Sequence, residues 1–79
     1  MKKITLGIYQ HYKGKYYQVL GTARHSETLE ELIVYKALYR SEFGLNSFWV
    51  RPRKMFQQKV KVDGKSVPRF RYIGRKKPS

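Results

Sequence analysis

The sequence predicts an all-β domain, a small antiparallel barrel or roll of five to six short strands. Three observations predict it. The β-prone stretches are short and turn residues separate them, two of the turns contain a lysine–glycine or aspartate–glycine pair, and seven Tyr, four Phe and one Trp supply rings for a half-buried sheet. A chain of 79 residues makes one domain, 1–79, and we expect its ordered core at about 6–74.

The first two strands are predicted to form a hairpin. Gly7–Tyr12 is aromatic and β-prone, the lysine–glycine pair at 13–14 supplies a turn, and Tyr16–Ala23 returns. Side chains alternate between the two faces of a strand, so Tyr9 and His11 are expected to point the same way.

Residues 27–40 fit two patterns. A capping box begins at Thr28 and apolar residues follow at helical spacing, but a continuous helix would bury Lys36. Alternation fits better, because one side of an extended segment then carries Ile33, Tyr35, Ala37 and Tyr39. We expect a short helical turn near Thr28–Leu32 and then a strand at Ile33–Tyr39. A full helix, which would make the domain α+β, stays open.

The segment after the next glycine-centred loop is predicted to be one strand followed by a tight turn. Phe48–Arg51 is β-prone, and Pro52 ends it because proline cannot donate to a central ladder. Arg53–Phe56 then turns and places Met55 or Phe56 on the core.

The chain is predicted to finish with a second hairpin. Lys59–Val62 alternates strictly, the aspartate–glycine pair at 63–64 is a strong turn, and Val67–Ile73 returns. The two terminal segments, Met1–Thr5 and the basic tail at 75–79, are expected to be mobile.

Charge is the most unusual property of the chain. Its net charge is +13, and the last 37 residues hold eleven Lys or Arg against one acid, Asp63. Aromatic rings lie between these cations, a combination that suits phosphate chains and stackable bases. The same composition also fits a solvated basic surface without a ligand.

Several classes of protein are disfavoured by composition. There is no cysteine, which excludes disulfides and thiolate metal sites and favours the cytoplasm. No apolar run is long enough for a membrane span, and no signal peptide is apparent. Two histidines and five acids offer no metal site, no paired carboxylates and no evident nucleophile–base pair, so we expect neither a cofactor nor catalysis.

Several stretches of the sequence are similar to a small bacterial domain family of unknown function. The similarity covers Gly7–Gly14, Tyr17–Thr28, Trp49–Pro52 and Val62–Phe70, and the run from Ala23 to Thr28 is specific to it. The resemblance implies an SH3-like small barrel and no established activity, cofactor or catalytic residue. It also implies relatives that are less basic, with acids at the positions of Lys54, Lys59 and Lys61, so a nucleic-acid role need not extend to the whole family.

Candidate ligand-binding residues come from four segments. If the first and last strands are neighbours, rings and cations from both converge with those of the strand at 48–51. The candidates are Tyr9, His11, Arg24, His25, Trp49, Arg51, Arg69 and Arg71.

Two of these segments have structural alternatives. The loop at 24–28 fits either an anion site or a set of local caps, with His25 bonded to the backbone. If Phe48 and Val50 face inward, Trp49 and Arg51 lie together on the outer face. Trp49 is otherwise a core residue.

We therefore expect a non-catalytic module, a monomer or weak dimer, that binds a polyanion such as RNA or DNA. The alternative is an SH3-like module that binds a protein or peptide, with Trp49, Tyr9 and Tyr12 lining a groove for an extended or proline-rich segment.

Overall fold

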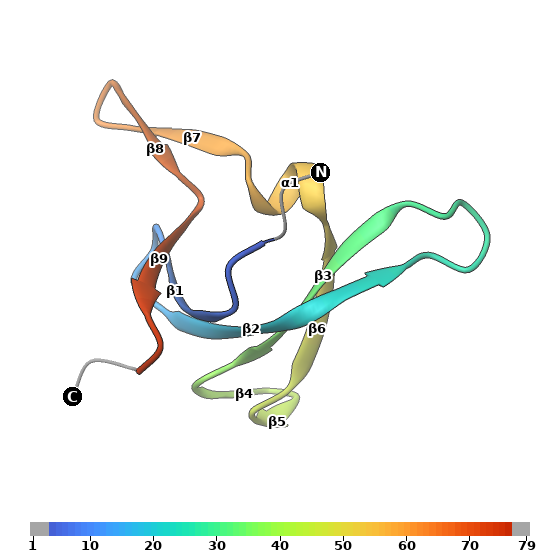
Figure 1. Cartoon of the computed structure of the whole chain (residues 1–79). Helices are drawn as coiled ribbons and strands as arrows, with labels where there is room; N and C mark the ends of the chain where they lie inside the picture. Colours follow the sequence, from blue (N-terminus) through green and yellow to red (C-terminus); the bar gives the residue numbers. More distant parts are fainter. Residues whose placement is uncertain (1–3, 77–79) are drawn as a thin grey trace.

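The structure is a computed structural model and describes residues 4–76. Its body is a five-stranded antiparallel sheet in the order β6-β3-β2-β1-β9 (Figure 1). The strands are β1 (Gly7–His11), β2 (Tyr16–Arg24), β3 (Glu31–Ala37), β6 (Phe48–Pro52) and β9 (Phe70–Gly74). The predicted all-β class is confirmed, but the sheet is not a closed barrel, because β6 and β9 remain its two edges.

Two small hairpins and one helical turn complete the chain. The strands β4 (Arg40–Ser41) and β5 (Gly44–Leu45) pair with each other, as do β7 (Lys59–Val62) and β8 (Lys65–Pro68). The β7–β8 hairpin extends away from the main sheet (Figure 1). Within the described residues no helix has the length and apolar character needed to cross a membrane. The outermost parts of both expected tails, 1–3 and 77–79, lie outside these residues.

Pairing of the strands confirms several sequence predictions. The strands β1 and β2 form the first hairpin, with Tyr9 opposite Tyr17. The first and last strands are neighbours, with Gln10 opposite Arg71. The ambiguous segment is a strand, β3, which begins earlier than expected because its ladder with β2 reaches as far as Arg24 and Glu31.

The helical turn lies at a different place from the expected one. Residues 25–30 must reverse the chain between β2 and β3, and Glu31 is already paired in the ladder, so no helix forms near Thr28–Leu32. Leu29 instead takes a positive φ of 63°, and its amide donates to the carbonyl of His25. The helical turn is α1 (Arg53–Phe56), directly after Pro52.

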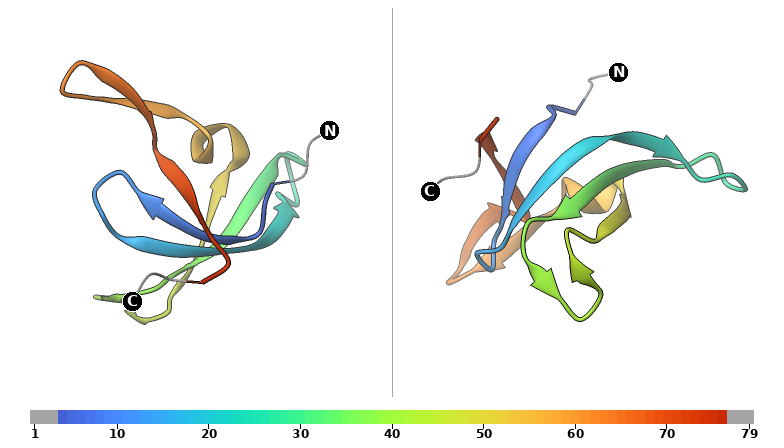
Figure 2. Two further views of the ribbon diagram at one scale, coloured as in Figure 1. Left: turned by 60° about the vertical axis from the view of Figure 1, so that its left-hand side comes forward. Right: turned by 90° about the horizontal axis from the view of Figure 1, so that it is seen from below.

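The hydrophobic core lies on the inner side of the curled sheet, where α1 covers it (Figure 2). As predicted for the turn at 53–56, Phe56 enters the core and is 2% exposed. Its ring stacks on Phe70, with centroids 4.2 Å apart and planes 5° apart. The other buried members of the core are Tyr9, Val19, Ile33 and Tyr35.

Candidate anion-binding site

Phe70 joins the two edges of the sheet. It lies opposite His11 in the β1–β9 ladder, and the two rings meet edge to face with centroids 4.9 Å apart. The guanidinium carbon of Arg51, which comes from β6 at the other edge, lies 5.5 Å from the centre of the same ring. Because the sheet curls, Arg51 from one edge strand and His11 from the strand next to the other edge meet over one aromatic side chain.

Four basic side chains gather at this point, and we call them the cationic cluster: His11, Lys13, Arg51 and Arg69. Burial lowers the pKa of His11 from its ordinary value, and the charges of Arg51, Arg69 and Lys13 lower it further. Within the described part of the chain, no carboxylate opposes this effect. The His11 imidazole is therefore held neutral in a positive local potential.

The neutral imidazole has a defined proton position. The backbone amide of Lys13 donates to His11 Nδ1 at 3.2 Å, so Nδ1 is an acceptor and the ring proton lies on Nε2. The ring is held between Phe70 and Tyr12, whose centroid is 4.6 Å away at an angle of 34°. His11 thus offers one N–H donor beside the arginines.

The arginines of the cationic cluster have no acidic partner among residues 4–76. Arg51 is half-buried against the Phe70 ring, and the ion pair within the described residues joins Arg53 to Glu31 at 3.1 Å instead. Arg69 donates weakly to Gln58 Oε1 at 3.4 Å, and its buried Nε has no hydrogen-bond partner in the described chain. A buried donor without a partner is unfavourable by roughly 1–3 kcal/mol, which an added acceptor would relieve.

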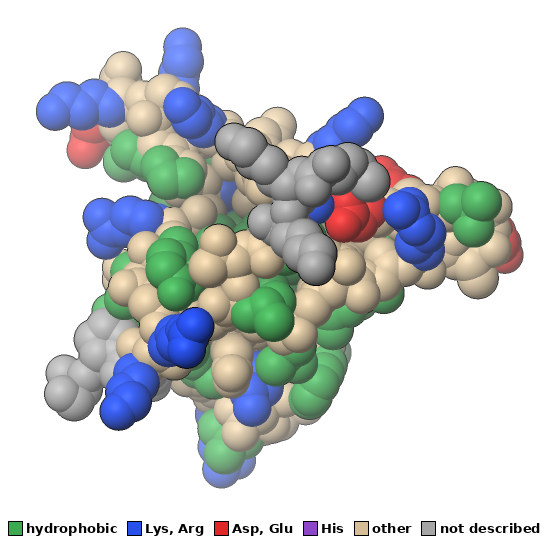
Figure 3. All heavy atoms as spheres, in the orientation of Figure 1, with side chains coloured by type: hydrophobic (Ala, Val, Ile, Leu, Met, Phe, Trp, Pro, Cys, Tyr) green, Lys and Arg blue, Asp and Glu red, His purple; other side chains and the backbone are tan. Residues whose placement is uncertain are grey.

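The acidic side chains are concentrated on one part of the surface. Three of the five acids, Glu27, Glu30 and Glu31, belong to the β2–β3 hairpin. In Figure 3 the acidic side chains lie mainly over this hairpin, with one on the β7–β8 hairpin, whereas Lys and Arg side chains lie beside the acids as well as around the β7–β8 hairpin and the lower part of the sheet. On this face the surface outside the β2–β3 hairpin is therefore mainly cationic, which suits an anionic ligand.

A hydroxyl pair lies next to the cationic cluster. Tyr17 and Tyr39 share a hydrogen bond of 2.7 Å between their hydroxyl oxygens, and the Tyr17 ring packs edge to face on His11 and Phe70. Burial and this hydrogen bond raise the pKa of Tyr17 well above its usual range. The Tyr17 hydroxyl therefore stays protonated near neutral pH and adds no negative charge.

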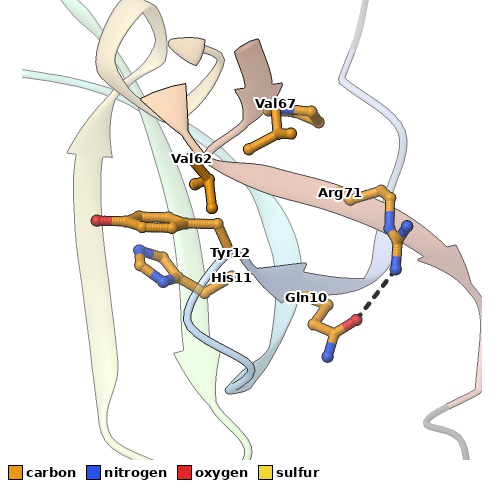
Figure 4. A pocket seen from close by; sticks show the side chains of 7 residues that line it. Gln10, His11, Tyr12, Val62, Val67 and Arg71 are labelled. Carbon is orange, nitrogen blue, oxygen red and sulfur yellow. Dashed lines mark hydrogen bonds between the residues drawn. The ribbon is translucent and has the colours of Figure 1, made fainter. Parts of the chain in front are cut away.

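A cavity of about 340 Å³ adjoins the cluster, between the end of β1 and the β7–β8 hairpin (Figure 4). His11 belongs to both the cavity and the cationic cluster. The lining residues are Gln10, His11, Tyr12, Val62, Val67, Pro68 and Arg71. At the rim, Arg71 Nη2 donates to Gln10 Oε1 at 3.3 Å, the contact dashed in Figure 4.

The structure brings some of the predicted site residues together and separates others. His11, Arg51 and Arg69 converge in the cationic cluster. Tyr9 is buried beneath them in the core, and its hydroxyl donates to the Thr5 carbonyl at 2.7 Å. Arg71 pairs with Gln10 in the β1–β9 ladder and lines the cavity rather than joining the cluster.

The predicted orientation of β6 is reversed. Trp49 and Arg51 do share a face, but they are paired with Tyr35 and Ile33, so this is the core side of the sheet. Phe48, expected to face inward, is on the opposite face and is 68% exposed. At the end of the edge strand the Trp49 ring packs against Phe43, with centroids 5.4 Å apart, and stays partly exposed.

Local hydrogen bonds hold the predicted loop at 24–28. His25 Nδ1 accepts from the backbone amides of Glu27 and Thr28 at 3.1 and 3.4 Å. Arg24 Nη1 donates to the Leu29 carbonyl at 2.9 Å. These contacts are the local capping arrangement that the sequence left open, with His25 bonded to the backbone as an acceptor. Both residues lie at the far end of the β2–β3 hairpin, outside the cationic cluster.

Sequence reasoning missed two contributors beside His11. Lys13 was interpreted only as part of a turn, although its side chain acts on the His11 imidazole. Tyr12, which the sequence places only in the groove of the alternative peptide-binding function, is 39% exposed and lines the cavity. The available signal was their position directly after a candidate residue, at a turn where side chains leave the strand alternation.

The fold and the site together define a small all-β domain with a cationic and aromatic surface. The chain belongs to a family described as proteins of unknown function (DUF1653), whose model matches residues 7–72. A crystal structure of a member of that family from Bordetella bronchiseptica is similar to it, with 37% identity, a TM-score of 0.85, and coverage of 96% of this chain and 95% of that one. No curated protein matches the sequence. The family resemblance inferred from the sequence is therefore confirmed.

Proposed function

We propose that the protein is a non-catalytic module that binds a polyanion, RNA or DNA, through phosphate contacts centred on the cationic cluster. The observation that carries this proposal is that His11 and Arg51 meet on the Phe70 ring beside Arg69 and Lys13, with no carboxylate against this cluster among residues 4–76. A phosphate oxygen would accept from the guanidinium and imidazole N–H groups there.

The net charge supports the same ligand. A charge of +13 on 79 residues is unfavourable through self-repulsion, and a polyanion that neutralises it releases condensed counterions on binding. Phosphate contacts carry no sequence information, so we expect weak sequence selectivity. A nucleic-acid ligand also agrees with the cytoplasmic location that the absence of cysteine favours.

The test is titration of a labelled single-stranded oligonucleotide at two salt concentrations. Three phosphate contacts, one for each fixed charge of the cluster, give a slope of about −2 in a plot of log K against log salt. Affinity should then fall about 20-fold between about 50 and 200 mM salt. Absence of binding at the lower concentration, or binding that salt does not change, would contradict the proposal.

One observation favours a second function, binding of an extended peptide by an SH3-like module. Exposed apolar side chains are concentrated at the β6 edge of the sheet and in the adjoining β4–β5 hairpin: Phe48 and Val50 on one face of β6, Trp49 with Phe43 on the other, and Leu45 in β5. Surface patches of this kind commonly mark protein contacts. The groove first envisaged for this function does not form, because Tyr9 is buried. A response of Trp49 fluorescence to acidic or proline-rich peptides, but not to oligonucleotides, would favour this second function.

A further inference from the structure

We infer that the cavity beside the cationic cluster receives a base of a single-stranded nucleic acid, while the phosphates next to that base lie on the cluster. This inference rests on the proposed function and names the form of its ligand. The link is His11, which lines the cavity and also belongs to the cluster. A nucleotide inserted here would therefore meet apolar walls and cationic donors together.

The walls of the cavity suit a flat ring. Tyr12 supplies an exposed aromatic ring that is supported from behind by the His11 imidazole. Val62, Val67 and Pro68, from the β7–β8 hairpin, form the apolar wall on the other side (Figure 4). Aromatic and aliphatic walls bind the π-face of any base, which is how single strands are held without sequence preference. The volume of about 340 Å³ is at the small end of ligand cavities and suits one nucleotide.

The rim of the cavity is polar and cationic. Gln10 Nε2 donates to the Gly14 carbonyl at 3.3 Å, and its Oε1 accepts from Arg71, so the amide is fixed in one orientation. A single contact to Gln10 leaves other guanidinium N–H groups of Arg71 as donors for a base edge or a phosphate. The Nζ of Lys13 lies 5.8 Å from the centre of the Tyr12 ring.

Charge complementarity favours a nucleic acid as the occupant. The hairpin that forms one wall carries the exposed Lys65, which pairs with Val62 and therefore lies on the same face of the hairpin, whereas Lys59 and Lys61 lie on the opposite face. Lys65 and the cationic cluster therefore lie on the two sides of an apolar slot, which matches a base whose two flanking phosphates extend in opposite directions. An apolar peptide would fill the slot but leave these charges without partners.

The test compares two ligands of equal charge on the unmodified protein. A ten-residue oligothymidylate and an abasic strand of the same length have the same phosphates, so the cluster should bind both. We expect the oligothymidylate to bind about 5- to 150-fold more tightly, as for the stacking of one base. Tyr12→Ala should remove that difference and Tyr12→Phe should retain it. Phe48→Ala, which truncates an exposed ring on the opposite face, should leave the difference unchanged.

The possible outcomes separate the inference from the function on which it rests. Equal, salt-dependent binding of the two strands would overturn the base site and leave polyanion binding standing. Absence of binding to both strands and to inorganic polyphosphate would overturn both. An acidic peptide that binds more tightly than the oligothymidylate and displaces it would also overturn the inference. If Tyr12→Ala does not fold, the test is made on the unmodified protein by NMR. The amide chemical shifts of Val62 and Val67 must then change when oligothymidylate is added and not when the abasic strand is added. Equal shifts would refute the inference.

Discussion

Replacement of Arg51 by glutamine removes one charge from the cationic cluster and little else. The side chain comes from an edge strand, packs on one ring, and has no acidic partner among residues 4–76. Arg51→Gln therefore tests the phosphate site without leaving a buried carboxylate unpaired. Thermal melting of the variant is the first measurement, because it shows whether loss of the contact to Phe70 affects the fold.

The expected change in affinity follows from counterion release. Each phosphate contact to a single strand contributes about 0.7 to the slope of log K against log salt. With 1 M salt as the reference, at which the lost contact contributes nothing, the variant should bind about 8-fold more weakly than the unmodified protein at about 50 mM salt and about 3-fold more weakly at about 200 mM. The slope itself should decrease by about 0.7.

The assay is fluorescence anisotropy of a labelled oligonucleotide over a salt series, with two matched variants. Arg51→Lys retains the charge, so its slope of log K against log salt should equal that of the unmodified protein, even if affinity falls because lysine lacks the planar guanidinium group. Lys36→Gln removes one charge from the opposite face, where Lys36 pairs with Gln18 and Phe48, and should lower the slope less. Equal slopes for Arg51→Gln and Lys36→Gln would refute the cluster as the phosphate site.

Three further predictions concern the fold and its titration. Phe56→Ala should lower the free energy of unfolding by about 3–5 kcal/mol, a large part of the roughly 4–12 kcal/mol expected for a domain of this size. Urea denaturation measures the effect, with Phe56→Leu as the control. A urea midpoint that falls less for Phe56→Ala than for Phe56→Leu would contradict the prediction. Because folding lowers the pKa of His11, the unfolded chain binds a proton at His11 first as pH falls, so the free energy of unfolding should decrease below about pH 6.5 and level off below the folded pKa. His11→Gln should flatten this dependence between about pH 7.5 and 5.5. A pH dependence that the substitution does not change would show that His11 is not its cause. Gly7 has a φ of +136°, and a Cβ atom there would lie 2.7 Å from the carbonyl oxygen of Gly74. Gly7→Ala should therefore lower the free energy of unfolding, measured by urea denaturation, by about 1–3 kcal/mol. Gly21→Ala is the control and should have a much smaller effect, because no atom lies within 4 Å of a Cβ at that position.

The sequence predicted those features that depend on neighbouring residues. Alternation identified the extended segments, including the strand that competes with a helix at residues 31–37, because a helix would have buried Lys36. Aspartate–glycine at 63–64 predicted the β7–β8 hairpin, where both residues have positive φ. The tight turn at 53–56 was predicted because Pro52 ends β6, and Phe56 enters the core as expected.

The face of β6 could not be predicted in the same way. Alternation places Trp49 with Arg51 and Phe48 with Val50, but it does not say which pair is buried. That choice depends on the register with β3, which places Trp49 opposite Tyr35 on the core side. The helical turn was misplaced for a similar reason, because the length of the β2–β3 ladder, which reaches Glu31, leaves no room for one near Thr28.

What the sequence alone determined, then, is the all-β class, the positions of the strands and turns, and a positive charge interleaved with rings. The tertiary structure decided which of those charges meet. Arg51 and His11 are 40 positions apart and lie near opposite edges of one sheet, and only the curl of that sheet brings both onto Phe70. The β7–β8 hairpin likewise closes one side of the cavity beside Tyr12 only after the sheet has folded. Local patterns fix the direction of a side chain relative to its own strand, whereas convergence depends on twist and register accumulated over several strands.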